Sequence, residues 1–348
     1  MRYSLERLSL FICILQITSC EHLVNEGTNT MIRPNECINI SKDNSFNVVF
    51  PEVLHCIDLQ LVNDTLLVLN SQGVGADSLL FSVYSTRMFE FLGSFVRKGR
   101  GPDEMLSPSI AKTGSDYPYL AVRDNQAEKT YLVNVPLSID YHNSSYNYCS
   151  DMTKGLLDWC PISNHTQLIM HVDDNQLLFS VYDYSGQKTI DYNLYKQLNA
   201  NKYMTKLSSI ITSNTSYATA AIFMVCFPYF TVLSDNGHVQ SFYTSSDYKK
   251  WRHIIDDSFS SESIQYYSSV TSSPQYIIAS YLGCSIGQSF KPGHGCHLHV
   301  FDWSGNFLYD FSIQEDILDM TYDSIHKHLY CISQFDEKII RFDLSNEL

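Results

Sequence analysis

The sequence is poor in positive charge. Lys and Arg number 23 against 37 Asp and Glu, which gives a net charge of -14 over 348 residues. No basic stripe relieves this balance, so the chain would repel a phosphate backbone and we expect no nucleic-acid partner. Helix-forming residues are scarce, whereas aromatic residues reach 13%, with 24 Tyr and 19 Phe. Such side chains suit half-buried strands, so the composition predicts an all-β protein.

Long apolar runs and familiar catalytic motifs are also missing. Beyond the N-terminal stretch, no run reaches the roughly 18 apolar residues of a membrane-spanning helix. Residues 219–233 come nearest, but their length and Pro228 indicate buried strands. The sequence contains no G-x-S-x-G elbow, H-E-x-x-H helix or P-loop, and no G-x-G-x-x-G after a strand. We therefore expect no cofactor, and no motif assigns an enzymatic reaction.

The N-terminal residues are expected to form an export signal. Arg2 and Arg7 precede an apolar run over residues 8–17, which is too short to span a bilayer and has the size of a signal-peptide core. The next residues, Ile17-Thr18-Ser19-Cys20, resemble the bacterial lipobox. That resemblance implies that Cys20 becomes the lipidated first residue of the mature chain. A plain signal peptide and a single N-terminal anchor helix remain the alternatives.

These features divide the chain into three parts. Residues 1–19 are expected to be a lipoprotein signal peptide, residues 20–35 a flexible tether, and residues 36–348 the folded domain. Acyl chains on a cysteine bind a membrane without any transmembrane segment, because each buried methylene contributes about 0.8 kcal/mol. We therefore expect the protein in the cell envelope, attached to the membrane through its lipid.

Eight cysteines remain after Cys13 and Cys20 are set aside, and an even number in an oxidising compartment permits disulfides. Cys56, Cys226 and Cys331 lie within apolar runs and are predicted to be buried thiols. Cys284 and Cys296 flank a loop rich in Gly, Pro and Ser, so they are the candidate disulfide pair.

The mature chain repeats one pattern every forty to fifty residues. A strand is followed by an Asp, Asn or Gly turn and by a second strand that ends in an aromatic residue and Asp, as in Tyr182-Asp183, Phe301-Asp302 and Phe342-Asp343. This period is typical of four-stranded propeller blades. Six blades are expected, at residues 54–95, 106–150, 155–200, 205–257, 262–314 and 315–344. The last is too short, so the strand within residues 36–50 is predicted to complete it and close the ring.

Residues 93–108, GSFVRKGRGPDEMLSP, interrupt this alternation. Glycine and proline permit a sharp reversal, so the stretch is predicted to cross from the outer strand of blade one to the centre. It also resembles the G-x-x-G-x-G-P-x-E-[FY] signature of six-bladed β-propeller lipoproteins common in Bacteroidetes, a TolB-like and NHL-like group. Gly99, Gly101, Pro102 and Glu104 match that signature, and Met105 stands where the group usually carries an aromatic residue. The resemblance implies the same fold and a structural role for the four matching residues.

Two clusters are candidates for binding. Arg97, Lys98 and Arg100 form a cationic group that could pair with a carboxylate of a partner, unless they form a solvated loop with an ion pair to Asp103 or Glu104. The segment KPGHGCHLH offers His294, His297 and His299, with Cys296 among them. In a strand His297 and His299 share one face, and imidazole and thiolate are ligands of zinc and copper. A surface loop with no metal is the alternative.

These observations favour a binding module. We expect a protein, peptide or glycan partner at the axial face where the inter-blade loops converge. A propeller enzyme, a hydrolase or lyase with its site at the central channel, is the alternative, because the fold alone does not decide between binding and catalysis.

Overall fold

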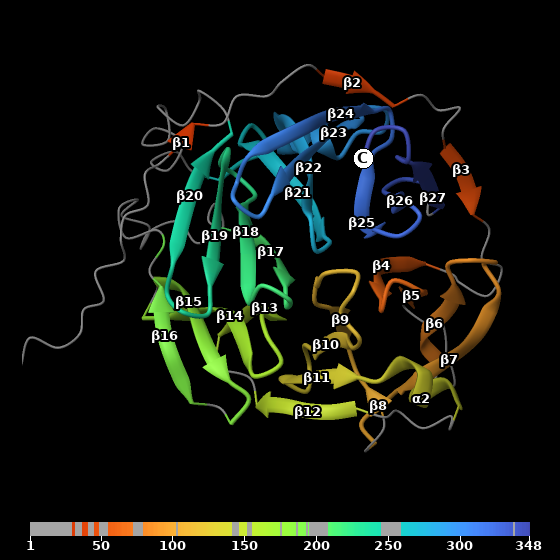
Figure 1. Ribbon diagram of the computed structural model, residues 1–348, viewed down its shortest axis with the longest axis vertical. Helices are drawn as coiled ribbons and strands as arrows, with labels where there is room; N and C mark the ends of the chain where they lie inside the picture. The colour runs from red at the N-terminus through yellow and green to blue at the C-terminus, as the bar shows by residue number, and fades with distance from the viewer. Residues whose placement is uncertain are drawn as a thin grey trace, which may run out of the picture.

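Six small sheets surround a common axis and form a closed ring (Figure 1). The computed structural model describes residues 30–31, 37–40, 45–48, 55–71, 79–101, 104–140, 146–151, 155–174, 176–185, 187–192, 194, 208–244, 259–336 and 338–348. Two short helices, α2 (Val135–Asp140) and α4 (Ile286–Ser289), accompany the strands in this part of the chain. Neither of these described helices is long and apolar enough to cross a membrane. The predicted all-β, six-bladed propeller is confirmed.

Each blade is a meander of four antiparallel strands that starts near the axis and ends at the rim (Figure 1). Blade one consists of β4 (Cys56–Val62), β5 (Leu66–Ser71), β6 (Leu79–Ser85) and β7 (Phe91–Lys98). Blade two consists of β9 (Pro108–Ile110), β10 (Leu120–Asp124), β11 (Lys129–Val133) and β12 (Tyr146–Asp151). Blade three consists of β13 (Leu156–Pro161), β14 (Thr166–Asp173), β15 (Gln176–Asp183) and β16 (Lys188–Tyr192).

The second half of the ring follows the same plan. Blade four consists of β17 (Ser209–Asn214), β18 (Thr219–Met224), β19 (Tyr229–Ser234) and β20 (Val239–Tyr243). Blade five consists of β21 (Ile264–Ser272), β22 (Tyr276–Ser285), β23 (Cys296–Asp302) and β24 (Phe307–Ile313). Blade six takes β25 (Ile317–Asp323), β26 (His328–Ser333) and β27 (Ile339–Asp343) from the C-terminus. Each of the six predicted blades coincides with one of these sheets.

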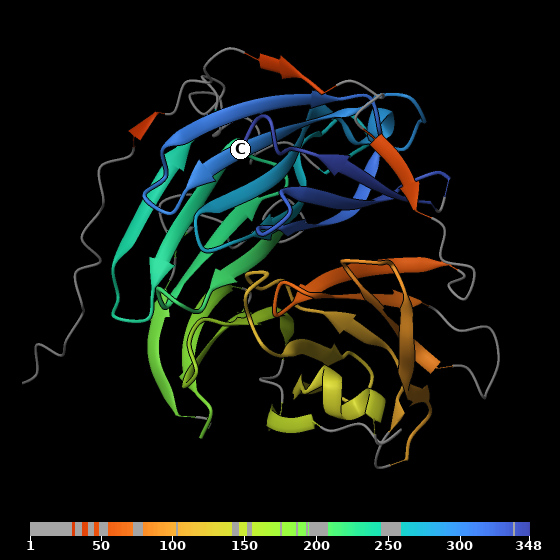
Figure 2. The same ribbon diagram turned by 45° about the vertical axis from the view of Figure 1, so that its right-hand side comes forward.

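The N-terminal segment closes the ring. β3 (Ser45–Val48) pairs antiparallel with β27 and supplies the fourth strand of blade six, as predicted. Two shorter pieces precede it on the rim: β1 (Thr30–Met31) runs parallel to β20, and β2 (Cys37–Asn39) runs parallel to β24. Figures 1 and 2 show all three outside the C-terminal half of the ring. These three strands therefore lie on the rims of blades four, five and six in turn.

The repeated aromatic-Asp pair has a structural reason. In blades three, five and six it ends the third strand, where the carboxylate accepts hydrogen bonds from backbone N–H groups of the following turn. Asp302 accepts from the backbone nitrogens of Ser304 and Asn306, both at 2.9 Å, and Asp343 accepts from that of Ser345 at 2.9 Å. Asp side chains stabilise turns in this way because they mimic a backbone carbonyl.

The hydrophobic core is divided among the blade interfaces. Six clusters of buried side chains are found in the described residues, one between each pair of neighbouring blades, including blades six and one. Trp159, for example, is fully buried between blades two and three. Burying one such large side chain contributes about 1.5–3 kcal/mol or more. Stability is thus spread around the ring and depends on every interface being present.

Candidate functional site

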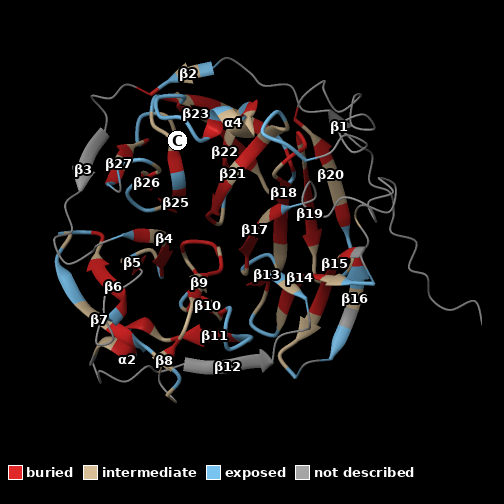
Figure 3. Ribbon diagram, turned by 180° about the vertical axis from the view of Figure 1, so that it is seen from behind, coloured by how far each residue is buried: buried red, intermediate tan, exposed pale blue. Residues whose placement is uncertain are grey.

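The two ends of the ring differ in the loops that they carry. One end, here called the hairpin face, bears the turns between first and second strands. The other, the inter-blade face, bears the crossings from one blade to the next and the turns between second and third strands. Helix α4, which lies between β22 and β23, belongs to the inter-blade face (Figure 3). The partner site was predicted where the inter-blade loops converge, which is on this face.

An ion pair lies near the axis. Nζ of Lys112, which follows β9 of blade two, is 2.5 Å from Oδ2 of Asp319 on β25 of blade six, and both side chains are largely buried. Blades two and six are not neighbours, so the contact passes on the axial side of blade one. Asp319 also accepts hydrogen bonds from the Leu59 backbone nitrogen at 3.0 Å and from Ser269 Oγ at 2.9 Å. These bonds connect blades one, two, five and six.

Two further carboxyls complete what we call the axial charge cluster, which is Asp58, Lys112, Asp158 and Asp319. Asp58, Asp158 and Asp319 follow a bulge near the start of the innermost strand in blades one, three and six. Burial raises the pKa of Asp58 to about 7, partly offset by a hydrogen bond from the Ile110 backbone nitrogen. Burial also raises the pKa of Asp158 to about 6, against the opposing charge of Arg123. The cluster therefore changes charge close to neutral pH.

We predict that Asp58 makes the stability of the domain depend on pH. Its folded pKa of about 7 exceeds the unfolded value of about 3.9, so the folded state retains the proton between these values. This contribution to stability is lost as the pH rises from about 4 to about 7. In urea unfolding, the free energy of unfolding of Asp58→Asn relative to that of the wild type should therefore rise by on the order of 1 kcal/mol or more from pH 5 to pH 8.

Asp343→Asn is the matched control. Hydrogen bonds from Ser345 lower the pKa of Asp343, so this carboxyl is ionised throughout that pH range. Its stability difference from the wild type should be the same at both pH values. If the stability difference between Asp58→Asn and the wild type were also the same at both pH values, the pH dependence could not be assigned to Asp58.

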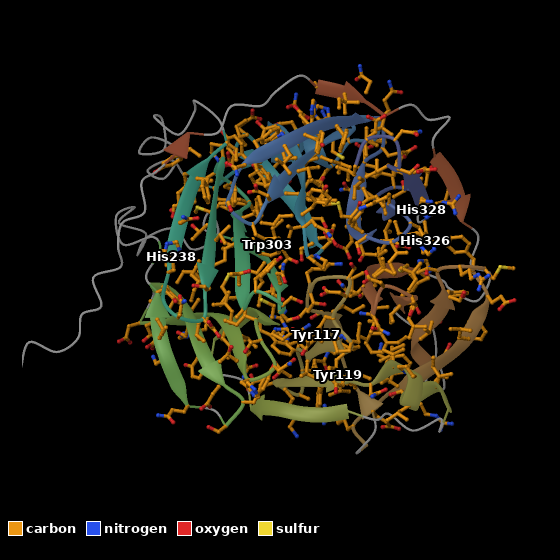
Figure 4. All side chains as sticks on the ribbon, viewed as in Figure 1. Tyr117, Tyr119, His238, Trp303, His326 and His328 are labelled. Atoms are coloured by element: carbon orange, nitrogen blue, oxygen red, sulfur yellow. The ribbon has the colours of Figure 1, made fainter. Side chains whose placement is uncertain are left out.

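A loop from blade two crosses the axis at the hairpin face. Residues 111–119, here called the axial loop, join β9 to β10; Figure 4 labels Tyr117 and Tyr119 from this loop. Gly114 forms an isolated parallel bridge with Ser272 of blade five, on the opposite side of the ring. The backbone nitrogen of Asp64 in blade one donates to the Ser115 carbonyl at 2.7 Å. Protein thus occupies the axis at this end, and we expect ligands to approach the axial charge cluster from the inter-blade face.

The inter-blade face also carries exposed apolar side chains around α4. Their exposed fractions are high for such large groups: 69% for Phe290, 45% for Phe259, 42% for Leu318 and 38% for Phe335. We call these four residues the α4 patch. Single exposed apolar residues are common on proteins, but a group from adjacent loops is typical of interaction sites.

Hydrogen bonds hold the loops of the α4 patch together. The backbone nitrogen of Gly287 in α4 donates to the Ser261 carbonyl at 2.7 Å, beside Phe259. Gln334, next to Phe335, donates from its side chain to the Ser289 carbonyl at 3.4 Å and from its backbone to the Asp316 carbonyl at 2.8 Å. Phe259, Phe290 and Phe335 are therefore carried on loops connected by hydrogen bonds, whereas Leu318 lies in β25, two residues after Asp316.

The glycine motif forms the crossing from blade one to blade two, as predicted. Glu104 folds back into the loop, where Oε2 accepts a hydrogen bond from the Gly101 backbone nitrogen at 2.7 Å. A Cβ atom at residue 99 would overlap the Glu104 carboxylate, which explains Gly99. Met105, in β8 (Glu104–Met105) on the edge of β7, is fully buried between blades one and two, so an apolar residue serves there. Pro102 lies outside the described residues.

The cationic group lies at the rim and not at the axis. Arg97 and Lys98 end β7, the fourth strand of blade one, and Arg100 follows in the loop; all three side chains are exposed. Among the described residues they form no ion pair, and Glu104 is bonded to the loop backbone instead. They remain candidates for contact with a partner's carboxylate at the edge of blade one.

Of the three predicted metal-binding histidines, His297 alone belongs to a group of potential metal ligands among the described residues. His297 and His299 share a face of β23, with ring centroids 6.5 Å apart, as predicted. His299, however, is buried and stacked on Tyr281 with a centroid distance of 4.3 Å, and burial lowers its pKa to about 4. His294 is exposed in the loop before the strand. His297 instead lies beside Cys37 and Asp310.

The predicted disulfide between Cys284 and Cys296 is wrong, because the structure holds both residues as free, buried thiols. The segment between them contains α4 and is not a tight hairpin. Tyr281 pairs with His297, so the same register would place Cys296 opposite Leu282, two residues away from Cys284. Cys56, Cys226 and Cys331 are buried thiols, as predicted. Cys20, the proposed lipidation site, lies outside the described residues.

Sequence reasoning missed the axial charge cluster and the α4 patch. The sequence did contain a signal for the cluster. An Asp stands between two apolar residues at the same position in three blades, as in Ile57-Asp58-Leu59, Leu157-Asp158-Trp159 and Leu318-Asp319-Met320. The α4 patch has no such pattern, because its members come from four separate loops and strands.

Comparison with known proteins shows the fold. No protein-family model and no curated protein matches the sequence. Among solved structures, the chain is similar to a member of the DUF4221 family from Bacteroides vulgatus, with 11% identity, a TM-score of 0.54 and coverage of 86% of this chain and 95% of the other. It is also similar to a candidate exported protein from Bacteroides fragilis, with 12% identity, a TM-score of 0.54 and coverage of 90% and 99%. At such identities the likeness shows a shared propeller fold, and kinship with the TolB-like and NHL-like lipoproteins stays a prediction.

Proposed function

We propose that this chain is an envelope-located binding module, lipid-anchored at Cys20, that recognises a protein or peptide through the α4 patch. The observation that carries the proposal is the group of four large apolar side chains exposed on connected loops and on strand β25 in blades five and six. Interfaces between proteins have an apolar centre with aromatic anchors and a polar rim. The polar residues Gln288, Lys291 and Gln334 lie within two residues of patch members in the sequence.

A protein partner is favoured over a glycan by the aliphatic member of the patch. Aromatic rings stack on sugars as well as on proteins, but Leu318 offers only apolar contact area. Burial of apolar area contributes about 25 cal/mol per Å² before the costs of association are subtracted. Binding of a glycan would therefore use only part of the exposed surface.

Affinity capture from detergent-solubilised envelope tests the proposal. The bait is the chain from residue 21 onward, which lacks both the proposed signal peptide and the proposed lipid. Adding Phe290→Ser and Phe335→Ser should weaken capture of the partner by at least about thirtyfold, the loss expected for aromatic hot spots. Ile325→Ser is the matched control, because Ile325 is 59% exposed but lies in the β25–β26 turn on the hairpin face.

Equal capture by the patch variant and by the parent bait would contradict the proposal. Loss of capture with Ile325→Ser alone would move the site to the hairpin face. A glycan array probed with the same three proteins tests for a sugar ligand. If the ligand is a sugar, the parent bait should bind to the array, and free sugar should compete with that binding.

The axial charge cluster favours a second candidate, a hydrolase or lyase with its site near the axis. A carboxyl with a pKa of about 7, as in Asp58, suits a general acid or base at neutral pH. Hydrolytic screening of the wild type and Asp58→Asn decides this, since an activity that the variant loses would support catalysis. Partner capture that survives the same substitution would keep the two functions distinct.

A further inference from the structure

Three side chains that bind metals in proteins converge at the rim of blade five. They come from Cys37 on β2, His297 on β23 and Asp310 on β24. Parallel pairing sets Cys37 beside Asp310, and antiparallel pairing sets His299 beside Asp310, with His297 two residues earlier on the same strand. The ligand atoms Sγ, Nδ1 and Oδ1 of the three residues all lie within 4.8 Å of one another.

We propose that Cys37, His297 and Asp310 form a binding site for a divalent cation of the zinc class. Zinc accepts thiolate, imidazole and carboxylate ligands at about 2.3, 2.0–2.1 and 2.0–2.2 Å. In a tetrahedral site such bond lengths separate nitrogen from oxygen by about 3.3 Å and nitrogen from sulfur by about 3.6 Å. The structure has 2.8 Å between Nδ1 and Oδ1 and 3.9 Å between Sγ and Nδ1. Both separations match to about half an ångström, which rotation of the side chains can supply.

The convergence of all three groups on one point distinguishes a metal site from a catalytic triad. In a Cys-His-Asp relay the thiol contacts one ring nitrogen of the histidine and the carboxylate contacts the other. Here both Sγ of Cys37 and Oδ1 of Asp310 lie beside the same atom, Nδ1 of His297. A cation placed among them would contact all three ligands at once.

The surroundings suit a three-ligand site with an open position. Asp310 is buried, whereas the side chain of His297 is 41% exposed and Cys37 is exposed, so the cation would be held from the protein side and reached from solvent. Zinc sites with three protein ligands keep a fourth position for water or another ligand. His299 does not belong to the set, because it is packed between Tyr281 and the hydroxyl of Tyr267.

Metal binding would fasten the N-terminal segment to the ring. β2 consists of three residues and is held by parallel pairing with β24. A cation bound to Cys37 and His297 would add a link between β2 and β23, the strand on the inner side of β24. The site would therefore stabilise β2 on the rim, in the same segment that later supplies β3.

Zinc titration of the purified full chain, prepared without an affinity tag or chelator, tests the proposal. We expect one equivalent of zinc per chain by elemental analysis, and at least about a hundredfold weaker affinity for Cys37→Ser and for Asp310→Asn. His294→Asn is the matched control, since His294 lies three residues from His297 but outside the cluster, and it should bind zinc like the wild type.

Cobalt(II) provides a readout that identifies the thiolate. Its complex with the wild type should show a sulfur-to-cobalt charge-transfer band in the near ultraviolet, and Cys37→Ser should lose this band while its circular dichroism stays unchanged. Absence of stoichiometric zinc in the wild type would overturn the proposal. Loss of zinc in His294→Asn, with zinc binding retained in Cys37→Ser, would also overturn it, in favour of the set of ligands that the sequence suggested.

Discussion

Deletion of residues 36–50 is expected to unfold the whole domain and not merely to remove one edge. The deletion takes away β3, the fourth strand of blade six, together with β2 and the buried Ile40 that packs between blades five and six. Loss of one buried isoleucine side chain typically costs about 2–5 kcal/mol, and domains of this kind are stable by only about 5–15 kcal/mol. The exposed edge of β27 would also favour aggregation.

Thermal unfolding followed by far-ultraviolet circular dichroism measures this effect. The truncated chain should show no cooperative transition, whereas deletion of residues 21–29, which precede the first described strand, should leave the transition unchanged. A cooperative transition at the wild-type temperature in the chain without residues 36–50 would show that the ring does not depend on its N-terminal strand.

Replacement of Lys112 by Met is expected to have the second-largest effect. Lys112 is the cation of the axial charge cluster, and its removal leaves the carboxylate of Asp319 buried without its ion-pair partner. Breaking one side of a buried pair typically costs about 3–5 kcal/mol. The Met variant should therefore unfold at a clearly lower urea concentration, with an unchanged dependence on denaturant.

An exposed ion pair provides the control. Lys338 lies 3.0 Å from Asp336, and both side chains are more than half exposed, so Lys338→Met should cost less than about 1 kcal/mol. The combined variant Lys112→Met, Asp319→Asn should cost less than the sum of its single substitutions, because both remove the same contact. Equal effects of Lys112→Met and Lys338→Met would show that the axial pair does not hold the blades together.

The fold could be predicted because its signals are local. Each blade repeats a strand, a turn and a strand within about forty to fifty residues, and Asp302 and Asp343 bond to backbone only two to four residues away. The closing role of β3 also followed from counting, since blade six has only three strands in the C-terminal segment. Local pattern and strand number were sufficient for the architecture.

The candidate sites could not be predicted in the same way, because their contacts are distant in sequence. Lys112 and Asp319 are 207 residues apart, and Cys37 and His297 are 260 apart. His294, His297 and His299 are close in sequence, yet His294 precedes β23 and His299 is buried against Tyr281, which the sequence pattern does not reveal. The disulfide prediction failed for a related reason, since α4 and the strand register set Cys284 and Cys296 apart.

Site-specific photo-crosslinking in intact cells tests the proposed binding face most directly. A photoreactive amino acid in place of Phe290 places the probe at the most exposed member of the α4 patch, and the same residue in place of Ile325 probes the hairpin face. We predict a discrete crosslinked partner from position 290 and none from position 325. A partner captured only from position 325, or no partner from position 290 in cells that produce the protein, would contradict the account.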